Sequence, residues 1–297
     1  MSARLRPLVI GLLSAVLLTA CGAGGSGAPS SDSGSALPTP ARDEALAKMV
    51  PPAVTADGKL VIGTNPTYPP NEFTDTDGQT IIGFDADMGK AVAAKLGLTA
   101  EFQNSTFNAI IPGIQSGKYE AGLSSFFVNP ERLKSVDMVS FFNVGTHLGV
   151  LKGNPEKLSL DNLCGHNVGV ELGTVQVDDL TARNKTCTDT GKPPINVTSL
   201  QDQSDVTLAL TARRISAMLA DGPVVVYAQT STGGQIEVVG PQYAATQYGI
   251  VIAKNSTQLG PAIEGAVNAL IKDGTYQAIL AKWKLSEGAV AAAKWQH

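Results

Sequence analysis

The sequence predicts an α/β protein made of two successive units of alternating strands and helices. Short apolar runs alternate with longer segments whose apolar residues recur at helical spacing; the alternation stops near residue 124 and resumes near residue 166. Such alternation is typical of parallel βαβ units. The chain has 297 residues, 43% hydrophobic and 16% charged, so it is long enough for one large or two medium globular domains.

The first unit contains three expected strands and two expected helices. Asp85 and Asp87 lie where the first helix begins and Gly97 lies where it ends, which are the positions that favour acids and glycine respectively. The second helix contains Pro112, which we expect in or near its first turn. The expected order is a strand at 59–64, a helix at 83–97, a strand at 98–103, a helix at 107–117 and a strand at 119–124.

The second unit repeats this alternation and is followed by two further helices. Asp221 and Pro223 lie where the last helix of the unit begins, and both residue types are common at helix starts. Strands are expected at 166–172, 195–200, 215–220, 236–240 and 248–253, and helices at 174–184, 203–214, 221–230, 257–274 and 275–285.

The first twenty residues read as a targeting segment. Two arginines precede an apolar run of roughly ten residues, which is too short to span a bilayer and suits a signal peptide. Small residues lead directly into Cys21, which resembles a bacterial lipoprotein signal in which the cysteine is lipidated; a plain secretory leader is the alternative. We therefore expect an extracytoplasmic protein anchored to the cell membrane through Cys21, because each buried methylene of a lipid contributes about 0.8 kcal/mol.

Residues 21–57 are expected to form a flexible tether. The segment after Cys21 is rich in Gly, Ser, Ala and Pro and cannot bury enough apolar surface to offset its ordering entropy. The folded part is expected to begin near Gly58, and no later segment is apolar enough to span a membrane.

The cysteines, histidines and charges exclude several classes of function. Cys164 and Cys187 remain after Cys21, and an even pair in an oxidising compartment favours one disulfide over two free thiols. The three histidines are scattered and no Cys/His spacing suits a metal, so no metal site is expected. No P-loop or dinucleotide fingerprint is present in the sequence, and no cofactor is expected. The net charge is −4 without any run of Lys or Arg, which argues against a nucleic-acid partner.

Eight motifs follow one another between about Lys59 and Trp283, and each of them alone is weak evidence. The motifs are GTNPTYPPNEF, IIGFDADMGKAVAAKLG, FNAIIPGIQSGKYEA, NPERLKSVDMV, VGVELGT, SAMLADGPVVVYA, QYGIVI and KDGTYQAILAKW. Together and in this order they resemble bacterial extracellular solute-binding protein family 3, the receptors that deliver polar amino acids to ABC importers.

The resemblance implies a two-lobe periplasmic-binding-protein-like fold of type II, with two hinge strands between the lobes. Lobe 1 would comprise residues 58–147 and 248–297, and lobe 2 residues 148–247. A polar amino acid or similar zwitterion would be trapped between the lobes by closure, and the closed form would dock on a membrane permease. The protein would then not be an enzyme.

Three residues match the charged contacts of the family. Arg132 matches the arginine that binds the ligand carboxylate through its planar fork; otherwise it would be a solvent-facing arginine in a helical first turn. Thr174 lies at a helix start, where backbone N–H groups favour an anion, although it could also be a plain N-cap. Asp221 matches the acid that pairs with the ligand ammonium, and its alternative role is to cap the following helix.

Tyr68 and Phe107 match the aromatic pair that encloses the ligand side chain, with core packing as the alternative, more so for Phe107. Ser125 matches a residue whose main-chain carbonyl meets the ligand ammonium. Phe127 departs from the family, which commonly has a hydroxyl residue there, and it would form an apolar wall instead.

Two more positions bear on the ligand side chain. Asn65 stands where many members carry aspartate, and Glu171 occupies a strand position that often touches the ligand side chain. An acid there favours a cationic or amide-bearing side chain, unless Glu171 faces solvent or pairs with a lysine. The main alternative function is an enzyme like cyclohexadienyl dehydratase on the same scaffold, for which Glu171 beside Phe127 would be the only supporting feature.

Overall fold

The computed structural model describes residue 37 and residues 39–297. The predicted signal peptide, the predicted lipidation site Cys21 and most of the predicted tether therefore lie outside the described residues. Within 39–297, no helix combines the length and the apolar character that crossing a bilayer requires.

Two short helices, α1 (Glu44–Ala47) and α2 (Pro52–Thr55), lie within the segment that we expected to be a tether. The Asp43 carboxylate accepts hydrogen bonds from backbone N–H groups of α1. Val50 and Val54 are buried in the same core as α3 (Phe84–Lys95). The composition that predicted a tether ends near residue 41, and the residues after it include the apolar side chains that a core needs. The folded body therefore begins before Gly58.

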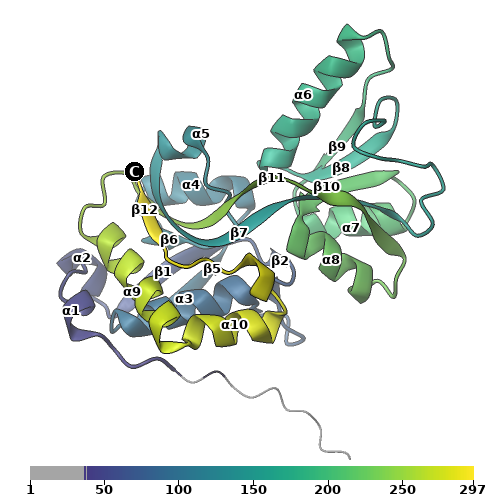
Figure 1. The fold of residues 1–297 in the computed structure, drawn as a ribbon. Coiled ribbons are helices and arrows are strands. Elements are labelled where there is room, and N and C mark those ends of the chain that lie inside the picture. The colour runs from purple at the N-terminus through teal and green to yellow at the C-terminus, as the bar shows by residue number, and fades with distance from the viewer. Residues whose placement is uncertain (1–36, 38) are drawn as a thin grey trace, which may run out of the picture. The chain divides into compact units, whose positions relative to one another are not determined.

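One mixed sheet of nine strands runs through the described body (Figure 1), in the order β5-β1-β6-β11-β7-β10-β8-β9 with β12 paired to β7. β1 lies parallel between β5 and β6, and β8 lies parallel between β10 and β9, as expected for two α/β units. A separate small sheet contains β2, β3 and β4. The strands are β1 (Lys59–Thr64), β2 (Thr67–Tyr68), β3 (Glu72–Thr74), β4 (Ile81–Ile82), β5 (Thr99–Asn104), β6 (Ala121–Gly122), β7 (Val136–Leu151), β8 (Asn167–Glu171), β9 (Asn196–Leu200), β10 (Ala217–Asp221), β11 (Ile236–Ala253) and β12 (Lys294–Gln296).

The two long strands β7 and β11 connect the two lobes. In lobe 1, β11 pairs with β6 and with the first half of β7; in lobe 2, the second half of β7 pairs with β10. The β7–β11 register shifts near Tyr243, and such irregularities bend and twist a strand pair. The two-lobe fold with two hinge strands is thus confirmed. The expected lobe boundaries, at residues 147/148 and 247/248, fall inside these strands and stay a prediction.

The final helices, α9 (Leu259–Asp273) and α10 (Thr275–Trp283), pack with α3 in lobe 1 (Figure 1), which explains why two helices remained after the second unit. Pro112 lies further along its helix than expected, in the middle of α4 rather than near its first turn. The remaining helices are α4 (Phe107–Gln115) and α5 (Pro130–Leu133) in lobe 1, α6 (Val175–Asp189), α7 (Gln203–Thr211) and α8 (Gly222–Ser231) in lobe 2, and the 3₁₀ turn η1 (Ser286–Gly288) at the end.

The predicted disulfide between Cys164 and Cys187 is confirmed, with the two Cα atoms 5.7 Å apart. It joins the loop before β8 to the last turns of α6. Cys187 is buried in a core of lobe 2 that includes Val168, Val170 and Leu180. The bridge therefore holds the far end of α6 while its first turn remains free to shape the site described next.

Candidate functional site

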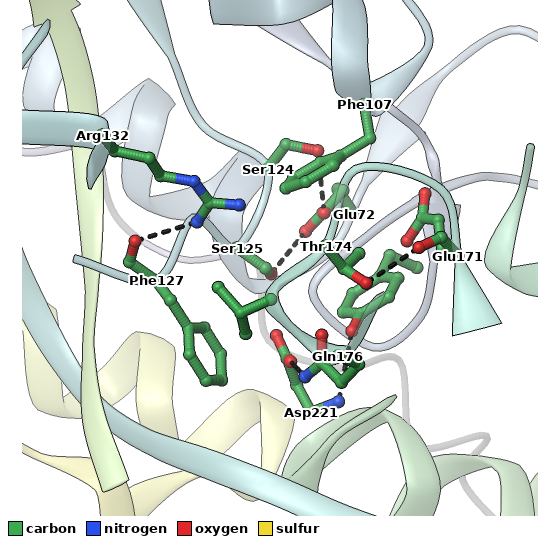
Figure 2. A pocket seen from close by; sticks show the side chains of 12 residues that line it. Glu72, Phe107, Ser124, Ser125, Phe127, Arg132, Glu171, Thr174, Gln176 and Asp221 are labelled. Carbon is green, nitrogen blue, oxygen red and sulfur yellow. Dashed lines mark hydrogen bonds between the residues drawn. The ribbon is translucent and has the colours of Figure 1, made fainter. Parts of the chain in front are cut away.

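A small cavity lies between the two lobes (Figure 2). Several lining residues lie where β8 and β10 end or where α4 and α6 begin, because the carboxyl ends of parallel strands meet at one edge of a sheet. Every predicted ligand-binding residue except Asn65 lines the cavity. The lining consists of Tyr68, Glu72, Phe107, Ser124, Ser125, Phe127, Arg132, Glu171, Thr174, Val175, Gln176 and Asp221.

Arg132 is held at the cavity wall by backbone groups. The Asn129 side chain accepts a hydrogen bond from the Arg132 backbone N–H and caps α5. The guanidinium donates to the carbonyl oxygens of Phe127, at 2.8 Å, and Gly173, at 3.4 Å. Among residues 39–297, no carboxylate lies within ion-pair distance of Arg132.

The charge of Arg132 is thus positioned but unpaired. Burial lowers the pKa of Arg132 to about 10, against the opposing effect of the nearby acid Asp221. The guanidinium carbon lies 5.4 Å from the ring centroid of Phe107. The Arg132 side chain is partly buried, and an anion in the cavity would meet a fixed guanidinium that retains hydrogen-bonding capacity.

Asp221 lies at the end of β10, and both oxygens of its buried carboxylate accept hydrogen bonds. Gln176 donates to one carboxylate oxygen at 2.7 Å, and the Tyr248 hydroxyl donates to the other at 2.8 Å. The carboxylate makes no capping hydrogen bond to α8, so capping does not explain this residue. Burial raises the pKa of Asp221 to about 7, although these donors oppose the shift.

Thr174 precedes the first turn of α6, but its side chain does not cap the helix. Its hydroxyl donates instead to the carbonyl oxygen of Glu171, at 2.8 Å. The first backbone N–H groups of α6 are therefore not used by this side chain and remain available to an anion.

Gly173 has a φ of +86°, and a Cβ atom added there would lie 2.9 Å from the Cβ of Asn108 in lobe 1. Both the positive φ and this close approach of the lobes require glycine.

The two predicted aromatic residues lie on the cavity from lobe 1. The Phe107 ring stacks on Phe126, with centroids 4.5 Å apart, so it is both a core residue and a wall. The Tyr68 hydroxyl accepts a hydrogen bond from the backbone N–H of Asp221, at 3.2 Å. Phe127 forms part of the wall as expected, and its carbonyl holds Arg132.

Glu72, a residue that the sequence reasoning missed, is a buried acid of the cavity wall. Its two carboxylate oxygens accept hydrogen bonds from Ser124, at 3.0 Å, and Ser125, at 3.1 Å. Burial and the neighbouring Asp85 raise the pKa of Glu72 well above its usual value. The sequence did contain a signal for Glu72, because it belongs to the NEF end of the first family motif. Gln176, a second lining residue that was not predicted, lies two positions after the GT that ends the VGVELGT motif.

Ser125 has a φ of 54°, which is uncommon for a residue other than glycine. Its backbone N–H donates to Asp85 at 2.7 Å, and its hydroxyl accepts from Asn71 at 2.9 Å while donating to Glu72. This network holds the turn that precedes Phe127 and Arg132.

Asn65 does not line the cavity. Its side chain donates to the carbonyl of Ser105 at 3.0 Å and to Asp202 of lobe 2 at 3.3 Å, and it accepts from the Thr67 hydroxyl. These bonds occupy the amide, so the structure gives Asn65 the role of a link between the lobes.

Glu171 is only 2% exposed, which excludes a solvent-facing carboxylate. Within the described part of the chain it has no cationic partner, and its Oε1 atom has no hydrogen-bond partner. Burial raises the pKa of Glu171 well above its usual value, and the nearby acids Asp221 and Asp202 raise it further.

Residues 60–286 match the sequence model of a protein family, the bacterial extracellular solute-binding proteins, family 3. The chain belongs to this family. Members that resemble it closely include the Arginine-binding protein ArgT of Corynebacterium glutamicum, which is 37% identical over 241 residues, covering 81% of this chain and 79% of the relative. The ABC transporter arginine-binding protein 1 of Escherichia coli is 28% identical over 234 residues, which cover 77% of this chain and 92% of the relative.

Solved structures of such solute-binding proteins share the fold. An ancestral arginine-binding protein bound to arginine matches with a TM-score of 0.70 and 34% identity, covering 76% of this chain and 98% of the other. An ancestral amino acid-binding protein described as a precursor of cyclohexadienyl dehydratase matches with a TM-score of 0.68 and 29% identity, and the match covers 78% of this chain and 97% of the other.

Proposed function

We propose that this protein captures a free amino acid outside the cytoplasm and delivers it to the permease of an ABC importer. The observation that carries the proposal is that one cavity is lined both by a guanidinium without an ion-pair partner, that of Arg132 in lobe 1, and by the buried carboxylate of Asp221 in lobe 2. A free amino acid brings a carboxylate and an ammonium into the same small volume, and each buried charge needs a partner of opposite sign.

In the proposed complex, Arg132 binds the ligand carboxylate from lobe 1, and the start of α6 at Thr174 binds it from lobe 2. Asp221 and the carbonyl of Ser125 bind the ammonium, while Tyr68 and Phe107 enclose the side chain against the wall formed by Phe127. The lobes, which we propose to comprise residues 58–147 with 248–297 and residues 148–247, close by bending β7 and β11.

Arginine is the ligand that we propose first. The buried carboxyl of Glu171 has no cationic partner in the described chain, and a guanidinium or ammonium on the ligand would supply one. Six similar relatives are named as arginine-binding proteins, two of them as putative or probable, and ArgT of Corynebacterium glutamicum is among the six. Others are named cystine-binding, so the family alone does not fix the side chain.

Native mass spectrometry of the protein purified without added ligand, followed by calorimetry with L-arginine, L-glutamine and L-glutamate, tests this function. The expected result is a co-purified or titrated basic amino acid that binds with micromolar affinity or better. A panel in which glutamate competes best would contradict the assignment of Glu171, and binding of no amino acid would contradict the function as a whole.

We also propose that the protein is a lipoprotein whose signal peptide, residues 1–20, is removed and whose Cys21 carries the lipid. The support is the sequence pattern alone. Cells that express the protein with an alkyne-tagged palmitate should label it and retain it in the membrane fraction. Cys21→Ser should abolish both, and labelling that survives the substitution would contradict the anchor.

The dehydratase alternative rests on the same cavity, because Glu171 could act as a general acid beside Phe127. Incubation with an arogenate-type substrate tests it. We expect no conversion, and turnover that depends on Glu171 would replace the binding function by an enzymatic one.

A further inference from the structure

The cavity holds more acids than cations. Glu72, Glu171 and Asp221 line it, whereas Arg132 is its only basic lining residue among the described residues. An isolated ionised carboxylate is costly to bury, so each of these acids must be hydrogen-bonded, paired or protonated.

Hydrogen bonds account for two of the three acids. Glu72 accepts from Ser124 and Ser125, and Asp221 accepts from Gln176 and Tyr248. Glu171 differs from both, because neither of its carboxylate oxygens accepts a hydrogen bond from any described residue and Oε1 is fully buried. Glu171 is therefore the lining acid whose carboxyl group receives neither a hydrogen bond nor an ion pair from the described residues.

The groups that face Glu171 do not supply the missing positive charge. Asp221 at the end of β10, Asp202 at the start of α7 and Glu72 on β3 are acids, and each disfavours an ionised Glu171. Tyr68 on β2 is a phenol whose own pKa burial raises.

On α6, which follows Glu171, the first turn contributes the neutral Gln176 and the acid Asp178. Arg132 on α5 lines the same cavity, but Asp221 and Asp178 are the acids that act on it.

We propose that Glu171 is a proton-exchanging specificity residue, neutral when the cavity receives an uncharged side chain and ionised when it receives a cationic one. The proposal rests on the proposed amino-acid-binding function and deepens it, since it assigns two ligand classes to one acid. As a carboxylic acid, Glu171 can donate a hydrogen bond to an amide or ureido oxygen. As a carboxylate, it can pair with a guanidinium or ammonium.

The proton balance follows from these two states. When a cationic side chain binds, the Glu171 carboxyl group loses its proton to the buffer, and the ligand keeps its own protons. When a neutral side chain binds, Glu171 keeps its proton and no proton leaves from this group. Binding that releases a proton strengthens as pH rises, by up to about tenfold in affinity per pH unit between the bound-state and free-state pKa values.

Calorimetry with L-arginine and L-citrulline in buffers of different ionisation enthalpy tests the proposal. The two ligands share their backbone and length but differ in the charge of the terminal group. A pH of about 8 is suitable, because Asp221, whose pKa is about 7, is then largely ionised before either ligand binds. We expect arginine to release about one more proton than citrulline, as the linkage between binding and ionisation requires.

Glu171→Gln removes the titrating group while keeping its size. We expect this variant to lose the extra proton release, to bind arginine at least about tenfold more weakly, and to bind citrulline within a few-fold of the original protein. Glu101→Gln, an exposed acid on β5 that pairs with Lys59, is the matched control and should change none of these quantities.

Three outcomes would overturn the proposal. They are equal proton release with both ligands, an extra proton that persists in Glu171→Gln, and tight arginine binding beside no citrulline binding, which would mean that Glu171 stays ionised. In each of these the heat of arginine binding remains, so amino-acid capture survives. Loss of all binding heat in the original protein would instead contradict the proposed function and this inference with it.

Discussion

The Tyr248 hydroxyl donates a hydrogen bond to the Asp221 carboxylate at 2.8 Å, and so joins hinge strand β11 to the acid that we assign to the ligand ammonium. Tyr248 is fully buried, and the same hydroxyl accepts from Asn71 of lobe 1 at 3.0 Å. One side chain therefore connects the hinge, lobe 1 and the proposed ammonium site.

Replacement of this phenol should weaken ligand binding without unfolding the protein. Tyr248→Phe removes one donor to a buried carboxylate, which typically costs about 1.5–3 kcal/mol, or roughly 10-fold to 150-fold in affinity. Calorimetry with L-arginine measures the change. Tyr243→Phe is the matched control, because Tyr243 donates to Asp179 away from the cavity lining, and an equal effect from both variants would contradict the assignment.

Loss of the guanidinium should abolish binding. Arg132→Ala removes the proposed partner of the ligand carboxylate, and truncating one member of a buried charge pair typically costs about 2–5 kcal/mol. Circular dichroism should show an unchanged fold while calorimetry shows no micromolar binding. Arg42→Ala, which removes an exposed arginine paired with Glu44, should leave affinity unchanged. Retained affinity in Arg132→Ala would refute the carboxylate site.

A side chain at residue 173 should hinder closure. Gly173→Ala forces an alanine into a positive φ and places its Cβ against Asn108 of the opposite lobe, so the closed form is penalised more than the open one. We expect a lower affinity and, by small-angle X-ray scattering with saturating arginine, a larger radius of gyration. Gly191→Ala has a similar φ of +72° but no neighbour within 4 Å, so it should affect stability without affecting closure.

The disulfide should stabilise lobe 2 with little effect on the ligand. Cys164 and Cys187 are 23 residues apart and lie outside the cavity lining. Cys164→Ser with Cys187→Ser should lower the unfolding free energy by about 3 kcal/mol, the typical value for a loop of this length, measured by denaturant titration. Affinity for arginine should stay within a few-fold, and a larger loss would show that the bridge positions the start of α6.

The ligand-free protein should become less stable as the pH rises from about 4 to about 7. Asp85 and Asp221 titrate near 3.8 when unfolded and at about 7 when folded, so the folded state binds more protons in this interval. Stability is therefore highest near the lower value and falls up to about pH 7. Melting temperatures across this interval should decline, and Asp85→Asn should flatten the decline. A melting temperature that rises with pH would contradict the assigned shifts.

The sequence predicted the fold well because its signals are local. The strand that ends at Asp221 and the helix that starts at Pro223 each follow from apolar spacing and a turn residue. Local patterns failed at residues 44–55, where α1 packs against α9 and α2 against β1, so these short helices depend on tertiary packing rather than on their own length.

The site was predicted less completely, because hydrogen-bond partners come from distant parts of the chain. Sequence motifs placed Arg132 and Asp221 at the cavity, but nothing near Asp221 indicates that Tyr248 and Gln176 hold its carboxylate. Asn65 shows the converse: the motif suggested a ligand contact, and its amide is occupied by Asp202, 137 positions further along.

Within the described residues, protein groups alone supply several hydrogen bonds across the lobe interface, among them Asn65 to Asp202, Gln201 to Asn108, and the Asp221 backbone to Tyr68. Because none of them involves a bound molecule, they favour the shut arrangement to the same degree for every occupant. The protein must then distinguish between ligands by how fast each one dissociates. An amino acid that fits the cavity wall poorly dissociates at the next opening of the lobes, whereas one that fits well stays bound long enough to reach the permease.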